Sequence, residues 1–472
     1  MSRQKILIKA LFLLVSCSSL YTVSANIPKK WNFIVYIAGN NNLHRFALWN
    51  LKQMLQVGSN DNINILVQVD QWGKKNTTRY YIARNEAQIV DSYITTASNA
   101  SGTTQSLFDC AKWAIKSYQA DHHAIIVWNH GAGAVDPHIW GRLMPTQHDP
   151  LYVFNEETCL LEIDRKALIK KAIGFNETFE TYLSNQELTS VLSTISEKLL
   201  GGKKIEILGM DACYMSMIEV ASQIKNSVHF MVGSEDLEPG PGWNYQYVLE
   251  PFLRSSLSPH DFACHIVKSY EKEYKHVISD YTQSAIDMSK LTTLEENVNL
   301  VALSLLNLLS APGNETVFLT IQKIRQSNLY TTAFYNANYI DLQHFYKSLL
   351  GNMGARAIHS PLSLIEILEQ NLRVGIDLIN KACIANVRGP AFTNANGISI
   401  YFPTRSIHDS YPKTIFAQTT SWLNFLTAFV KKAGRIMPSA IDCVGTEQLV
   451  DDLNEYFPTD HDAVISRNNK HE

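Results

Sequence analysis

The sequence predicts an α/β sandwich, in which a mostly parallel central sheet is covered by helices on both faces. The first observation is an alternation of short, continuous apolar runs with segments of helical spacing. Such runs are typical of strands that are buried on both faces. The second observation is size, because 472 residues with 46% hydrophobic content provide enough material for a large buried core.

Each strand prediction rests on an apolar run that is rich in β-branched and aromatic residues. The run WNFIVYIA, for example, stops at the turn signal Gly39-Asn40-Asn41-Asn42. The predicted strands of the first half are Trp31–Ala38, Asn62–Asp70, Thr78–Arg84, His123–Trp128, Lys204–Leu208 and Ser227–Val232. The spacing of apolar residues predicts helices over about 43–57, 106–120, 185–200 and 215–224.

The second half of the chain has a different pattern. From about 255 to 380 the helical period dominates, and we expect a helical region there. A lone strand is predicted at 397–402 (GISIYF), followed by a helix over about 415–432. The sequence therefore predicts an α/β domain over 26–254 and a helical region over 255–380. The C-terminal part, 381–472, is expected to contribute one further strand and one helix.

Residues 1–25 have the order of a secretory signal peptide. Arg3 and Lys5 precede an apolar stretch that is far shorter than the roughly 20 residues of a spanning helix, and Val23-Ser24-Ala25 is a small-x-small cleavage site. A second interpretation stays open, because Leu14-Val15-Ser16-Cys17 resembles a bacterial lipobox. We therefore expect an exported protein, either secreted or periplasmic, or a membrane-anchored lipoprotein if Cys17 is lipidated.

Charge and motif content exclude several classes of function. The 41 Lys and Arg residues against 44 Asp and Glu residues give a formal charge of -3, which leaves no basic excess for binding nucleic acid. The sequence has no H-E-x-x-H or C-x-x-C motif, and its glycine-rich segments lack the pattern of a phosphate loop. We expect no metal and no cofactor, and the sequence does not support a dependence on calcium.

Two reactive side chains follow strands of the predicted sheet. His130 comes directly after the strand HAIIVW, and Cys213 follows the strand KIEIL through Gly209-Met210-Asp211-Ala212. Chemistry in open α/β sheets collects beyond the carboxyl ends of the strands. A thiolate is a nucleophile that a nearby imidazole can generate, and the helix expected after Cys213 would stabilise it. The bland alternative is a small buried cysteine and a structural loop histidine.

Six segments carry a resemblance to a known family. In chain order they are WNFIVYIAGNNNL, LVQVD, IVWNHGAG, LGMDACYMSMIEVA, VGSEDLEPGPGWNY and NGISIYFP. They resemble the clostripain family of cysteine peptidases, which shares its fold with caspases, gingipains and legumain. The resemblance covers about residues 30–245 and the strand near 400. It implies a caspase-like α-β-α sandwich with a helical C-terminal extension, His130 as general base and acid, and Cys213 as nucleophile.

The resemblance also assigns binding roles. Asp211 falls where clostripain-like enzymes place the acid of the S1 pocket, and a carboxylate there would pair with a substrate Arg or Lys. The alternative for Asp211 is a helix-capping role. Backbone N–H groups of Gly131 and Cys213 would form the oxyanion hole. The remaining residues that the resemblance places on the wall of S1 are Ser234, Glu235 and Trp243.

The sequence departs from the family in two places. Family members often have Asp where Asn41 stands, which leaves a calcium role of that turn in doubt. Residues from about 136 to 172 look like an inserted loop, and the family's D-E-T segment is displaced to Asn176-Glu177-Thr178. Clostripain-like enzymes mature by self-cleavage between the histidine and cysteine segments. The candidate cleavage residues in the loop are Arg142, Arg165, Lys166, Lys170 and Lys171; the alternative is an uncut loop with a basic helix face.

The expected function is therefore that of an exported cysteine endopeptidase. It would cleave protein or peptide substrates after Arg or Lys through a Cys213–His130 dyad, and its two cleaved chains would stay associated. The alternative from a different class is a catalytically weak, caspase-like surface module that only binds its partner.

Overall fold

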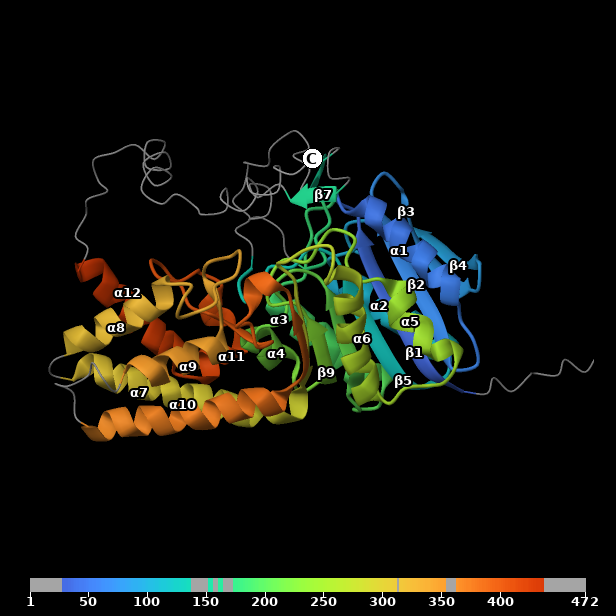
Figure 1. Cartoon of the computed structure of the whole chain (residues 1–472). Helices are drawn as coiled ribbons and strands as arrows, with labels where there is room; N and C mark the ends of the chain where they lie inside the picture. Colours follow the sequence, from blue (N-terminus) through green and yellow to red (C-terminus); the bar gives the residue numbers. More distant parts are fainter. Residues whose placement is uncertain are drawn as a thin grey trace, which may run out of the picture.

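The computed structural model describes residues 28–136, 152–155, 160–163, 173–311, 314–353 and 362–436. Within them, nine strands form one sheet in the order β12-β10-β9-β8-β5-β1-β2-β3-β4 (Figure 1). The five strands from β9 to β2 run parallel, and the pairs at both edges are antiparallel. The bounds are β1 (Lys29–Gly39), β2 (Ile63–Gln71), β3 (Asn76–Ala83), β4 (Glu86–Ile94), β5 (Ala120–Trp128), β8 (Ile205–Asp211), β9 (Val228–Gly233), β10 (Thr282–Asp287) and β12 (Cys383–Arg388).

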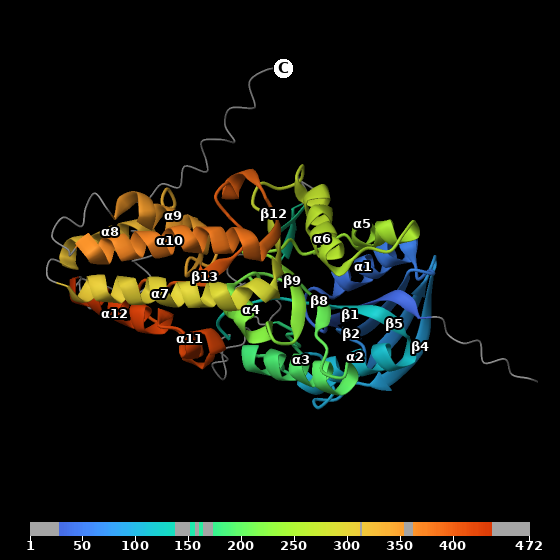
Figure 2. The ribbon, with the colours of Figure 1, turned by 90° about the horizontal axis from the view of Figure 1, so that it is seen from below.

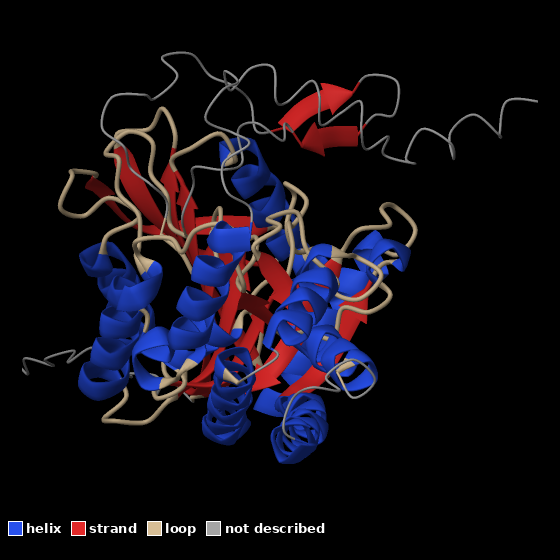
Figure 3. Cartoon of the chain, turned by 90° about the vertical axis from the view of Figure 1, so that its left-hand side faces the viewer, coloured by secondary structure: helices blue, strands red, loops and turns tan. Residues whose placement is uncertain are grey.

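Helices cover both faces of the sheet (Figures 2 and 3), which confirms the predicted α/β sandwich. One face packs against α1 (His44–Val57), α5 (Tyr245–Leu249) and α6 (Pro259–Tyr274), and the other packs against α2 (Thr104–Ser117), α3 (Asn185–Leu199) and α4 (Ile218–Ile224). Alternate residues of β1 belong to the two cores: Phe33 and Val35 to the first, Ile34 and Tyr36 to the second. This alternation explains why the strand reads as a continuous apolar run.

The helix boundaries follow from local chemistry. The Ser184 side chain accepts the N–H of Glu187, and the Glu187 carboxylate accepts the N–H of Ser184, which is a capping box at the start of α3. At the start of α6 the Ser258 side chain accepts the N–H of Asp261, and Pro259 occupies the first position, where no N–H is needed.

The second half of the chain forms a helical layer beside the sheet (Figure 1). Its helices are α7 (Leu291–Ser310), α8 (Asn314–Gln326), α9 (Leu342–Asn352), α10 (Leu362–Ala382), α11 (Ile415–Thr419) and α12 (Trp422–Ile436). Short 3-10 turns cover Glu250–Leu253, Met288–Lys290, Pro390–Phe392 and Tyr411–Lys413. A two-stranded sheet joins β11 (Tyr339–Asp341) to β13 (Ser399–Tyr401), inside the strand predicted at 397–402.

The expected helical region over 255–380 needs a correction, because it also contains β10 and β11. β10 pairs with β9 and with β12, so the main sheet continues beyond residue 254. The sequence of β10, TQSAID, is short and mixes polar with apolar residues, although nearly all of it is buried. It therefore has no hydrophobic periodicity from which a strand could be predicted. The edge strand β4 was missed for the opposite reason, since most of its residues are exposed.

Several predictions lie outside the described residues. They are the signal peptide 1–25 with Cys17, and all of the inserted loop except Asp136 and a small hairpin. That hairpin pairs β6 (Tyr152–Asn155) with β7 (Leu160–Ile163). Within the part of the chain that the structure describes, no helix is both long and apolar enough to cross a membrane.

Candidate active site

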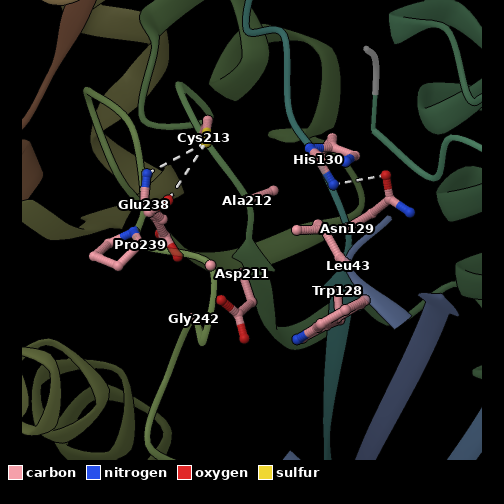
Figure 4. A pocket seen from close by; sticks show the side chains of 11 residues that line it. Leu43, Trp128, Asn129, His130, Asp211, Ala212, Cys213, Glu238, Pro239 and Gly242 are labelled. Atoms are coloured by element: carbon pink, nitrogen blue, oxygen red, sulfur yellow. Dashed lines mark hydrogen bonds between the residues drawn. The ribbon is translucent and has the colours of Figure 1, made fainter. Parts of the chain in front are cut away.

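His130 and Cys213 follow two neighbouring parallel strands. The register of β5 and β8 places Trp128 opposite Asp211, and the Asn129 N–H donates to the Asp211 carbonyl oxygen over 3.2 Å. His130 and Cys213 each lie two residues beyond this pair, on either side of one small cavity (Figure 4). The cavity measures about 20 Å³, room for about one water molecule. Its lining residues are Leu43, Trp128, Asn129, His130, Asp211, Ala212, Cys213, Glu238, Pro239, Gly240 and Gly242.

The thiol of Cys213 is buried and contacts the backbone of Glu238. Its Sγ accepts the Glu238 N–H at 3.3 Å and lies 3.9 Å from the Glu238 carbonyl oxygen. Burial raises the pKa of Cys213 to about 12, because the charged form would lose its hydration and the carboxyls of Glu238 and Asp236 oppose a second negative charge. In this conformation the thiol is protonated at neutral pH.

The helix expected directly behind Cys213 begins later than predicted. Helix α4 starts at Ile218, and Tyr214 has a left-handed φ of 63°, which turns the chain away from helical geometry. The Tyr214 N–H bonds to the carbonyl oxygen of Asp236. A helix N-terminus therefore does not stabilise the thiolate, and the expectation that it would was wrong.

The imidazole of His130 is held at one nitrogen by a side-chain amide. Its Nε2 lies 2.9 Å from Oδ1 of Asn42, which stands in the turn after β1. The main-chain N–H of His130 donates to Oδ1 of Asn129 over 2.6 Å. An amide oxygen only accepts, so this pairing places the hydrogen of a neutral ring on Nε2 and leaves the lone pair on Nδ1.

Gly131 lies directly against the residue that carries the thiol. A Cβ added at Gly131 would come within 2.1 Å of the Cys213 carbonyl oxygen, so only glycine fits there. The next residue is held from the helical layer, since the Tyr339 hydroxyl donates to the Ala132 carbonyl oxygen over 2.5 Å. The loop after β5 is thus fixed against both the segment of Cys213 and β11.

A second carboxyl accompanies Asp211 in the cavity. Asp211 accepts the Trp243 N–H at 3.2 Å and the Tyr245 hydroxyl at 2.8 Å, and it shares a hydrogen bond with the Glu238 carboxyl. Burial raises the pKa of Asp211 to about 6, and burial together with the Asp211 charge raises the pKa of Glu238 well above its usual value. Ionisation of either carboxyl group therefore opposes ionisation of the other.

Comparison with known proteins assigns the family. The model of the clostripain family matches residues 35–141 and 161–373, which is most of the chain. The chain belongs to the clostripain family. It is therefore a cysteine peptidase of the clostripain type, as its sequence segments predicted.

Solved structures agree with this peptidase in fold. A secreted C11 cysteine protease from Bacteroides thetaiotaomicron, in complex with an irreversible peptide inhibitor, is 18% identical with a TM-score of 0.54, over 84% of this chain and 99% of that chain. An inactive zymogen C11 protease from Parabacteroides distasonis is 15% identical with a TM-score of 0.51, over 85% and 99% of the two chains. No curated protein sequence matches the chain at a significant level.

The three residues expected on the S1 wall, Ser234, Glu235 and Trp243, do not line the cavity. Ser234 bonds to Thr282 of β10 at 2.8 Å, and Glu235 accepts the N–H of Gly397 at 2.9 Å. Both side chains are buried beneath the loop that follows β9, because the chain passes beside β10 when it leaves β9. The backbone N–H of Trp243 donates to the carboxyl group of Asp211. The ring of Trp243 packs on Gly209 and does not line the cavity. The residues of this segment that line the cavity are Glu238, Pro239, Gly240 and Gly242.

The remaining predicted residues have separate outcomes. The candidate cleavage residues Arg142, Arg165, Lys166, Lys170 and Lys171 lie outside the described residues. Asn41 binds the main-chain oxygens of Ala38 and Phe175 through its amide. Among the described side chains, no group of three or more His, Cys, Asp or Glu is placed to hold a metal ion.

We predict that Gly131→Ala lowers the melting temperature and abolishes peptidase activity. The added methyl group meets main-chain atoms, which cannot rotate away, and such overpacking costs about 1–3 kcal/mol. Gly351→Ala is the matched control, because an added Cβ at Gly351 meets nothing within 4 Å. Thermal unfolding and peptide hydrolysis measure both variants. Equal behaviour of the two would contradict the close contact at Gly131.

Proposed function

We propose that this peptidase is an exported endopeptidase that cleaves after basic residues, with Cys213 as nucleophile and His130 as general base and acid. The observation that carries the proposal is the placement of both side chains at one cavity, beyond paired parallel strands, with a buried carboxylate at its base. Thiol chemistry of this kind needs no metal or cofactor.

The proposed reaction proceeds through a thioester. The thiol of Cys213 passes its proton to Nδ1 of His130, and the thiolate attacks the substrate carbonyl carbon. The oxyanion would accept hydrogen bonds from the N–H groups of Gly131 and Cys213. His130 then gives the proton to the leaving amine, and a water molecule hydrolyses the thioester with His130 as base.

Basic specificity follows from the charge at the base of the cavity. Gly242, with a φ of 63°, brings its main chain against the Asp211 carboxylate, and an added Cβ would lie 2.3 Å from Oδ1. The carboxylate is thus held in place, buried, and negatively charged at neutral pH. A guanidinium or ammonium group would offset that buried charge directly. Glu238, which sequence reasoning did not select, adds a second carboxyl at the same point.

Self-processing is the second part of the proposal. A cavity of about 20 Å³ cannot contain an Arg or Lys side chain, and the Cys213 thiol is protonated, which together fit a latent uncut chain. One relative of similar fold is described as an inactive zymogen. Directly downstream of the inserted loop, the Glu177 N–H bonds to the Asn40 carbonyl oxygen at 2.8 Å, and the Phe175 N–H bonds to Asn129. These contacts would keep the second chain attached after cleavage.

Export rests on the sequence of residues 1–25 and on one comparison. The relative from Bacteroides thetaiotaomicron is described as secreted. We propose release to the periplasm or medium by cleavage behind Ala25, with lipidation at Cys17 as the alternative route to a membrane-anchored form.

We predict that Cys213→Ala abolishes hydrolysis of Arg- and Lys-terminated fluorogenic peptides and leaves thermal stability nearly unchanged. Only the nucleophilic sulfur is removed, since the small side chain contributes little to the core. Alkylation of the wild-type thiol should have the same effect on activity. Retention of more than about a tenth of kcat/KM would exclude Cys213 as nucleophile. Silence of the wild type towards Arg-, Lys-, Asp- and Asn-terminated peptides, with Cys213 unreactive, would favour the binding module.

We predict that Asp211→Asn selectively impairs basic substrates. Loss of the charge opposite a desolvated cation should cost about 2–5 kcal/mol in kcat/KM for P1 Arg, while a neutral P1 peptide is spared. Because the raised pKa of Asp211 is about 6, wild-type kcat/KM for P1 Arg should rise with pH through that value. The variant should lack this rise. An equal loss for basic and neutral peptides would show a structural role instead.

We predict that the wild type is cut at least once between Arg142 and Lys171, after Lys170 or Lys171 in particular, into two chains that purify together. Cys213→Ala should remain one chain. Intact mass and denaturing gels of both proteins, prepared without added protease, measure the outcome. A single-chain wild type, or identical cutting of the alanine variant, would rule out self-processing.

A further inference from the structure

A side chain from a third strand reaches the proposed catalytic pair. Asn42 follows β1, whereas His130 follows β5 and Cys213 follows β8. β1 is the neighbour of β5 on the side away from β8, so the imidazole lies between the Asn42 amide and the nucleophile segment. The contact joins Oδ1 of Asn42 to Nε2 of His130 over 2.9 Å.

From this arrangement we infer that Asn42 is a positioning residue, the third member of a Cys213–His130–Asn42 triad; the inference rests on the proposed function. The amide oxygen selects the ring tautomer with hydrogen on Nε2, and it fixes the rotation of the ring. Nδ1 is then the nitrogen that accepts the thiol proton. Once the ring is protonated, the Nε2–H···O bond becomes charge-assisted and stronger, which favours the thiolate–imidazolium pair.

The turn that carries Asn42 is held on both sides. The Asn41 side chain accepts the Leu43 N–H at 2.9 Å and donates to the Phe175 carbonyl oxygen at 2.9 Å. On the other side, the Thr178 hydroxyl donates to Oδ1 of Asn40 at 2.7 Å. A positioning residue needs this kind of support, because an amide on a loose turn could not fix a ring.

Helix capping does not account for the Asn42 side chain. The residue at the N-cap of α1 is Leu43, and no side chain caps that helix. The hydrogen bond to His130 also spans 88 residues of sequence, so it is not a local turn contact. The other titratable groups that line the cavity are Asp211, Cys213 and Glu238, and none of them takes the place of the Asn42 oxygen at Nε2.

The test compares Asn42→Ala and Asn42→Asp with Thr178→Val. The last variant removes a hydrogen bond from the same turn without touching the imidazole, so it measures the effect of loosening the turn alone. For Asn42→Ala we expect kcat for a P1 Arg peptide to fall about 10- to 100-fold, because part of the contribution of general base catalysis is lost. The KM of the variant should be nearly unchanged. The alkaline limb of its pH profile should move to lower pH.

Asn42→Asp should restore much of kcat, because it keeps an acceptor at Nε2. Its added charge stabilises the imidazolium, so the alkaline limb should move to higher pH than in the wild type. The pH dependence of Cys213 alkylation by iodoacetamide should shift in the same directions. This second measurement needs no substrate and therefore tests the triad even if the peptides chosen are poor substrates.

Two failures can be told apart. If wild-type hydrolysis persists in Cys213→Ala, the proposed function is wrong. If hydrolysis depends on Cys213 but Asn42→Ala has the kcat, pH profile and alkylation rates of Thr178→Val, the positioning role is wrong. The same holds if Asn42→Ala and Asn42→Asp lose activity equally and in proportion to lost thermal stability.

Discussion

The site depends first on the register between β5 and β8. Parallel pairing with Trp128 opposite Asp211 brings the two chain segments out of the sheet at the same level. The contact between Gly131 and the Cys213 carbonyl oxygen is possible only in this register. Because side chains alternate between the two faces of a strand, a slip of one residue would also exchange the two cores. The hydrophobic alternation that stabilises the sheet therefore sets the separation of the reactive side chains.

Side-chain amides join the segments around His130, together with the buried carboxyl group of Asp70. Asn129 accepts the N–H groups of His130 and Phe175, and Asn176 donates to Asp70 and to Ser101. A buried amide with partners costs far less than an unpaired polar group, so the amides can hold these segments together in the interior. The unbalanced charge of the cavity is then concentrated on the Asp211–Glu238 pair, where a cationic side chain would lower the electrostatic cost of burial.

Sequence reasoning predicted the strands that are buried on both faces, and with them the placement of His130 and Cys213. It missed β4, whose residues are exposed, and β10, whose buried face is polar, because neither has an apolar run. Asn42 and Glu238 could not be selected for a different reason. Each reaches the site from a loop, and only the packing of that loop against another strand gives the side chain its partner. The only feature of the sequence that could have indicated Glu238 as a site residue is its position directly before the Pro-Gly-Pro-Gly turn.

Glu238 connects the thiol of Cys213 with the carboxyl group of Asp211. Its backbone N–H lies 3.3 Å from the Cys213 sulfur, and its carboxyl shares a hydrogen bond with Asp211 in the base of the cavity. The following residues, Pro239, Gly240 and Gly242, form the wall that leaves only about 20 Å³. A displacement of this segment that includes Glu238 would change both the shape of the cavity and the contact of the thiol with its backbone partner.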